Sequence, residues 1–144
     1  MIIDNLEITG ALQISLNNEI VHQCDNLVVT AGKNWVAGRF KEGSIPDEMS
    51  HMAIGSADTA AAAGNTALAT ELNRIALTTD GGTVSTNTVQ YDASWTSAAA
   101  AYAIKEAGIF NAASGGTMLA RTTFAVINKG TDDTVSISWT ITVS

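Results

Sequence analysis

Charged side chains are scarce in this sequence of 144 residues: they make up 15% of it, where about 25% is usual for a soluble domain. Proline and cysteine occur once each, which excludes a collagen-like chain and a disulfide scaffold. Hydrophobic residues reach 46%, too many for a disordered chain. A small domain of this composition must cover its exterior with Thr, Ser and Ala, or bury part of that exterior against other chains.

Basic residues are few, and the net charge is −7. Nucleic-acid binding needs a positive footprint, whereas only Lys33, Arg39 and Lys41 lie close together, so we expect no nucleic-acid partner. The longest apolar runs are alanines at 60–63 and 98–101, far short of the roughly 20 residues of a membrane span, and we expect no membrane partner. The N-terminus lacks the basic and apolar regions of a signal peptide, which predicts a protein that is not exported.

The residues that could carry chemistry form no recognisable motif. Cys24 has no second metal ligand at the usual spacing, and we expect a buried or half-buried thiol. We interpret His51 as a structural histidine, hydrogen-bonded where a loop enters a strand. The adjacent Asp132 and Asp133 are expected to form a solvated turn rather than a calcium loop. The sequence therefore predicts no catalytic, cofactor-binding or metal-ligating residue, no cofactor and no enzymatic activity.

Glu106 stands inside the mostly apolar stretch 103–110. A carboxylate in such a strand must be paired or must point outward. The neighbouring Lys105 projects to the opposite face of a strand, so Arg121 on an adjacent strand is the better partner. We predict a structural ion pair or an interface contact here, and not a catalytic acid.

Hydrophobicity alternates with a period of two along much of the chain. The clearest case is the C-terminal stretch, whose apolar positions alternate with Ser and Thr: Val135, Ile137, Trp139, Ile141 and Val143. Residues 89–95 and 12–16 repeat the pattern. Asn17-Asn18 predicts a tight hairpin, and so do the glycine pairs at 81–82 and 115–116. This pattern predicts a mainly β domain, an antiparallel β-sandwich or jelly-roll-like fold, with one or two short helices.

Two segments break the alternation. Residues 30–40 predict a short amphipathic helix with Thr30 as its N-cap and with Trp35, Val36 and Phe40 packed on a sheet. A second short helix is predicted over 65–72, where Leu68 and Leu72 lie four residues apart. The stretches 43–50 and 57–64 are expected to be loops.

Nothing marks a domain boundary, so we predict a single domain over residues 1–144. Its first part, residues 1–25, is expected to be a β-hairpin. Two roles stay open for this hairpin: it could join the main sheet, or it could be an arm that reaches a neighbouring subunit.

Five blocks of the sequence follow one another from residue 26 onward: NLVVTAGK at 26–33, HMAIG at 51–55, EAGIFN at 106–111, GGTMLAR at 115–121 and WTITV at 139–143. In this order they resemble a family of small tailed-bacteriophage virion proteins. In that family such blocks occur in short standalone structural proteins and in modules of tail fibres. The resemblance implies a virion structural protein located in the phage particle and assembled in the host cytoplasm, and it carries over no catalytic residue.

A single domain suits one position in such a particle best. A capsid decoration (cement) protein needs one compact domain that binds the major capsid protein on the outside of the head shell. We therefore expect such a protein, present as a homo-oligomer, with a trimer favoured at three-fold positions. One alternative is a short tail-fibre or baseplate component that contacts a host receptor, for which Tyr102 is the candidate exposed aromatic. A third is a carbohydrate-binding or carbohydrate-cleaving module.

Overall fold

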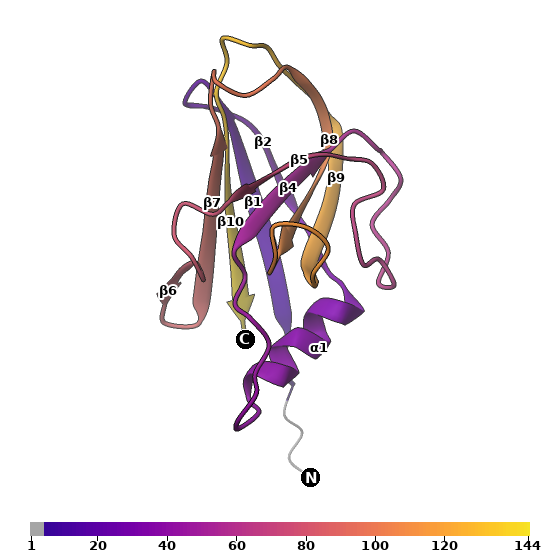
Figure 1. The fold of residues 1–144 in the computed structure, drawn as a ribbon, viewed down its shortest axis with the longest axis vertical. Coiled ribbons are helices and arrows are strands. Elements are labelled where there is room, and N and C mark those ends of the chain that lie inside the picture. Colours follow the sequence, from indigo (N-terminus) through magenta and orange to yellow (C-terminus); the bar gives the residue numbers. More distant parts are fainter. Residues whose placement is uncertain (1–4) are drawn as a thin grey trace.

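The computed structural model describes residues 5–144, and over this range the chain is a β-sandwich with 50% strand and 7% helix (Figure 1). Sheet A has the strand order β2-β1-β10-β7-β6, and its strands are β1 (Ile8–Leu16), β2 (Glu19–Asp25), β6 (Thr83–Ser85), β7 (Thr88–Trp95) and β10 (Val135–Val143). Sheet B has the order β3-β9-β8-β4-β5, and its strands are β3 (Leu27–Val28), β4 (His51–Gly55), β5 (Glu71–Ala76), β8 (Tyr102–Phe110) and β9 (Met118–Lys129). All pairings are antiparallel, which confirms the predicted fold class.

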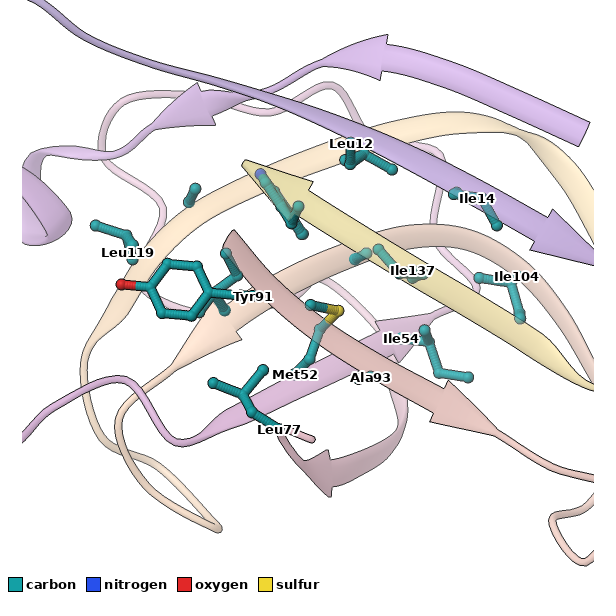
Figure 2. Close-up of a cluster of buried hydrophobic side chains, with 14 of the residues drawn as sticks. Leu12, Ile14, Met52, Ile54, Leu77, Tyr91, Ala93, Ile104, Leu119 and Ile137 are labelled. Atoms are coloured by element: carbon teal, nitrogen blue, oxygen red, sulfur yellow. The ribbon is translucent and has the colours of Figure 1, made fainter. Parts of the chain in front are cut away.

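The core fills the space between the two sheets (Figure 2). In β10 the predicted alternation is confirmed from Val135 to Ile141, with apolar side chains buried and hydroxyl side chains turned outward. The last apolar position, Val143, is 37% exposed, so the buried face of the strand ends at Ile141. Sheet B contributes the facing side chains, among them Met52, Ile54 and Ile104. Burying each such side chain contributes roughly 1.5–3 kcal/mol, so this core is the main source of stability.

The N-terminal hairpin was predicted over residues 1–25, of which residues 1–4 lie outside the described part of the chain. Its two strands, β1 and β2, belong to sheet A. Its β1 strand pairs with β10 of the same chain along its whole length, from Ile8 opposite Val143 to Leu16 opposite Val135. The turn holds Asn17 and Asn18 with φ of 52° and 68°, the left-handed conformation that asparagine tolerates and that a tight hairpin requires. The predicted turn is therefore confirmed.

The two glycine pairs have different roles. Gly115 and Gly116 turn the chain between β8 and β9, neighbours in sheet B, as predicted. The hairpin predicted at Gly81-Gly82 is wrong, because β5 lies in sheet B and the next strand, β6, lies in sheet A. This turn carries the chain from one sheet to the other, and at Gly82, with φ of 75°, a side chain would collide with the ring of Tyr91.

Helix α1 (Thr30–Arg39) lies at one end of the sandwich (Figure 1). Trp35 and Val36 pack against the core as predicted, but the predicted N-cap at Thr30 and the predicted packing of Phe40 are wrong. Val29, whose N–H donates to Leu119 O in sheet B, occupies the N-cap position without a side-chain cap, and Thr30 is the first helical residue. Phe40 is 79% exposed, because the last turn of the helix extends beyond the sheets.

The second predicted helix is also wrong. Residues 56–70 form no helix or strand, and Leu72 belongs to β5, which pairs with β4. Leu68 does become buried, but it does so in a loop that lies on the outer face of sheet B. The loops predicted at 43–50 and 57–64 are confirmed, apart from Met49, which is fully buried in the core.

Candidate interaction surface

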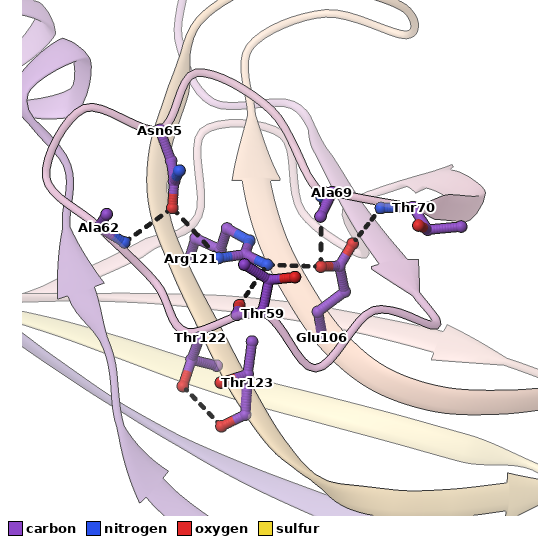
Figure 3. Close-up of polar contacts among 9 residues, drawn as sticks. All are labelled: Thr59, Ala62, Asn65, Ala69, Thr70, Glu106, Arg121, Thr122 and Thr123. Atoms are coloured by element: carbon purple, nitrogen blue, oxygen red, sulfur yellow. Dashed lines mark hydrogen bonds and ion pairs between the residues drawn. The ribbon is translucent and has the colours of Figure 1, made fainter.

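The predicted ion pair between Glu106 and Arg121 is confirmed (Figure 3). Their side chains, on neighbouring strands β8 and β9, meet at 2.7 Å between Oε2 and Nη2, and both are completely buried. Each also binds the loop above it: the carboxylate accepts from the N–H groups of Ala69 and Thr70, and the guanidinium donates to Thr59 O and Asn65 Oδ1. Both charged groups are held by contacts within the fold, and Arg121 Nε is buried without a hydrogen-bond partner among the described residues.

This pair fastens residues 56–70 over the outer face of sheet B. Beneath the loop lies a second apolar cluster formed by Val29, Ala53, Leu68, Phe110 and Met118. Gly55 permits the close approach, because a side chain there would collide with Glu106 Oε1 and Thr70 O. The chain therefore covers the outer face of sheet B itself, with an apolar layer and a buried ion pair.

The outer face of sheet A has a different composition. We call it the hydroxyl face, and its residues are Thr9, Ala11, Gln13 and Ser15 of β1, Gln23 and Asp25 of β2, Thr88, Gln90, Asp92 and Ser94 of β7, and Ser136, Ser138, Thr140 and Thr142 of β10. Register places them in cross-strand rows, for example Gln23, Gln13, Ser138 and Asp92. Every member is exposed or half-buried. The sequence predicted hydroxyl side chains on outward strand faces, and the structure gathers them on one side of the molecule.

Hydrogen bonds between neighbours hold part of the hydroxyl face in place. Ser138 Oγ donates to Asp92 Oδ1 at 2.6 Å, and Gln90 Nε2 donates to both oxygens of the same carboxylate at 3.1 Å. The hydroxyls of Ser94 and Ser136 lie 2.9 Å apart. These contacts restrict the side chains before any partner arrives, which lowers the entropy cost of covering the face.

The basic residues lie elsewhere, and several of them are buried. Arg121 and Arg74 have side chains only 1% and 7% exposed, and Lys129 donates from a buried Nζ to the carbonyls of Ala99, Ala100 and Gly130. The remaining four lie on or just after α1 or on β8: Lys33, Arg39, Lys41 and Lys105. The hydroxyl face therefore carries acidic charge from Asp25 and Asp92 and none of the seven basic residues, because these lie on or just after α1 or on strands of sheet B.

Cys24 and His51 have the structural roles that were predicted. The Cys24 thiol is half-buried with Sγ 3.7 Å from Thr122 Oγ1, and burial raises its pKa. His51 is the first residue of β4, and its Nδ1 lies 2.8 Å from Ser50 Oγ. A thiol with a raised pKa is a poor nucleophile near neutral pH.

Asp132 and Asp133 lie in the turn before β10, as predicted. The Asp133 carboxylate accepts hydrogen bonds from Asn17 Nδ2 and from the Gly130 N–H, and these bonds lower its pKa. Asn17 Oδ1 in turn accepts from the Thr134 N–H, so the two loops are fastened together. Across residues 5–144, no three His, Cys, Asp or Glu side chains come close enough to hold a metal ion.

The aromatic side chains do not form an exposed cluster in the described part of the chain. Tyr102, the predicted exposed aromatic, is half-buried and packs against the core, so that prediction is wrong. Phe40 is the aromatic that projects into solvent, next to Arg39 at the end of α1. Its exposure depends on where the helix ends relative to the sheets, which its sequence spacing does not reveal.

No helix among the described residues is long and apolar enough to cross a membrane. Comparisons with protein-family models, with curated proteins and with solved structures find no match to this chain.

Proposed function

We propose that this protein is a non-enzymatic structural component of a tailed-phage virion, a decoration protein that binds the major capsid protein on the outside of the head shell. The observation that carries the proposal is the hydroxyl face: a broad, uncovered sheet face of hydrogen-bonding side chains with little charge. Burying neutral hydroxyls against a partner costs far less desolvation than burying charges, and each can donate and accept in the new contact. The resemblance of residues 26–143 to phage virion proteins supports the same role.

The fold suits a protein whose work is to hold surfaces together. The buried ion pair, the apolar layers and the cross-linked loops all serve rigidity, and the outer face of sheet A is left for a partner. We propose that copies of the chain also contact one another, as a trimer at three-fold positions of the shell, because closed cyclic assemblies are the rule for such proteins. Light scattering of the purified protein at micromolar concentration tests this part: a monomer would contradict the trimer.

Copy number in purified virions is the direct test of position. On a stained gel, a decoration protein should approach the abundance of the major capsid protein. A few copies per particle would contradict the head position and favour the tail.

A matched pair of variants tests the surface. Thr140→Arg places a bulky cation in the middle of the hydroxyl face, whereas Thr66→Arg places one on the exposed loop over sheet B. We expect Thr140→Arg to be lost from the particles and Thr66→Arg to be retained, with both proteins folded by circular dichroism. The reverse result would move the binding surface to the sheet B side.

A short tail-fibre or baseplate component that contacts a host receptor is the second candidate. The observation in its favour is Phe40, an exposed ring at one end of the molecule that could stack on a sugar. Phe40→Ala should then reduce adsorption to host cells while leaving particle assembly intact. A decoration protein would show no adsorption defect with this variant.

A further inference from the structure

The two acidic side chains of the hydroxyl face differ in their contacts. Asp92 accepts hydrogen bonds from Ser138 and Gln90, so its carboxylate is already occupied. The Asp25 side chain, at the end of edge strand β2, has no hydrogen-bond or ion-pair partner among residues 5–144. A carboxylate that the fold itself does not use is available to a partner.

Asp25 also lies between two hollows. One, of about 510 Å³, is bordered by Gln13, Gln23, Gln90, Ser138 and Thr140 as well as by Asp25. The second, of about 490 Å³, shares Ala11, Asp25 and Thr140 with the first and continues towards β3. The hollows exist because β1 has small residues at this point, and Ala11 occupies the row between Asp25 and Thr140.

Asn26 lines the second hollow, and its side-chain amide has one buried contact within the fold. Asn26 Oδ1 accepts from Trp139 Nε1 at 2.6 Å, and because that indole nitrogen can only donate, the orientation of the amide is determined. Its Nδ2 is therefore a donor, and it is buried without a hydrogen-bond partner in the described chain. A buried donor without an acceptor costs roughly 1–3 kcal/mol.

We propose that the first hollow is a socket for an arginine side chain of the partner protein. The rim offers one carboxylate, three side-chain amides and two hydroxyls, so oxygen acceptors surround the hollow from several directions. A guanidinium has five donors in a planar fork and suits such a ring better than the compact ammonium of lysine.

Charge supports a foreign partner over a second copy of this chain. The first hollow has no basic residue on its rim, and Lys33, which lines the second, forms no ion pair with Asp25. The accessible arginine of this chain is Arg39, because those at 74 and 121 are buried. Arg39 already donates to Pro46 O and lies over the ring of Trp35, so it is held in its own loop.

The proposed socket specifies an arginine on the partner protein, and in that respect it rests on the proposed function. Binding of arginine to the socket can nevertheless be tested on the isolated protein. We would titrate ¹⁵N-labelled protein with the peptide acetyl-Ser-Arg-Ser-amide and follow amide chemical shifts. Shifts should concentrate at residues 10–13, 23–26 and 140. Acetyl-Ser-Gln-Ser-amide should leave them unchanged, and acetyl-Ser-Lys-Ser-amide should shift them less.

Three variants complete the titration. Asp25→Asn removes the free carboxylate and Ala11→Leu fills the hollow, and each should weaken arginine-peptide binding by about tenfold or more, the scale of one charge-assisted contact. Asp132→Asn changes an exposed carboxylate in the turn before β10, outside the hydroxyl face, and should leave binding unchanged. Shifts that are spread over the surface, or that persist in Asp25→Asn, would overturn the socket.

Adding the purified protein back to particles that lack it separates the two proposals. If the wild type binds and Asp25→Asn does not, an arginine of the shell occupies the socket. If the wild type fails to bind while the peptide titration succeeds, the socket stands and the head position fails. If all three variants bind particles as the wild type does and the peptide gives no localised shifts, the socket fails and the head position stands.

Discussion

The outer faces of the two sheets are covered in opposite ways. On sheet B the chain lays residues 56–70 over an apolar layer and a fully buried pair, Glu106 and Arg121. On sheet A the equivalent face is a set of hydroxyls, amides and two carboxylates open to solvent. The difference teaches that a face is apolar where the chain supplies its own cover. It is neutral and polar where water covers it.

Neutralising one acidic side chain on each outer face should give the largest difference in the free energy of unfolding. Glu106→Gln leaves the Arg121 guanidinium buried without a counter-ion, and we expect a loss of about 3–5 kcal/mol in the free energy of unfolding. Asp25→Asn, whose exposed carboxylate has no hydrogen-bond or ion-pair partner among residues 5–144, should change it by about 0.5 kcal/mol or less. Urea unfolding of both variants measures the difference. Equal effects would show that the loop over sheet B is not held by the pair.

A methyl group placed beneath the loop should have the next largest effect. Gly55→Ala would push against Glu106 Oε1 and Thr70 O, and overpacking of this kind costs up to about 3 kcal/mol. Ala11→Ser, in the hollow of the opposite face, adds an atom where there is space and should leave the unfolding midpoint unchanged. Thermal unfolding of the two proteins makes the comparison. A stable Gly55→Ala variant would mean that the loop can lift away without cost.

Alkaline pH should destabilise the protein through Tyr91, whose side chain lies on the buried face of β7. Burial raises the pKa of Tyr91 to about 12, with smaller opposing effects from Arg39 and Glu48. The unfolded phenol loses its proton from about pH 10, so the folded state holds more protons between these values and stability falls as pH rises. We expect a loss of about 2 kcal/mol by pH 12 from this group. Denaturant titrations at a series of pH values should show that the free energy of unfolding falls less steeply with pH in Tyr91→Phe than in the wild type. Identical slopes in the two proteins would contradict the raised pKa of Tyr91.

The smallest effect on stability is expected at the centre of the hydroxyl face. Thr140→Val keeps the shape and strand propensity of the side chain and removes its hydroxyl, so the free energy of unfolding should change by about 0.5 kcal/mol or less. Its retention on particles should fall, because the valine can no longer donate or accept in a contact. Denaturant unfolding and particle binding, measured on the same preparation, test whether binding is lost while stability is kept. A loss of stability without a loss of binding would contradict the role of the face.

Much of the local structure could be predicted from the sequence because it depends on neighbouring residues. Alternation over 135–141 identified a strand with one buried face, and Asn17-Asn18 identified its hairpin. The ion pair was predictable as well, since a lone Glu106 in an apolar strand must find a cation and Arg121 was the available one.

The errors arose where tertiary contacts outweighed local pattern. Residues 65–72 have helical spacing, yet Leu68 is drawn under a loop and Leu72 enters a strand that pairs with β4. Thr30 is a good capping residue, but pairing at β3 makes Val29 the residue before the helix. Neither competing contact is visible within a window of ten residues.

The scarcity of charge is a property of the sequence alone, and so is the placing of Ser and Thr opposite apolar residues along each strand. Those follow from composition and from the period of the extended chain. Which face stays bare, which cations are buried and where Asp25 meets two hollows were decided only by the tertiary structure. The reason is that strand order and loop position bring together residues distant in the sequence, and only those contacts determine what is covered.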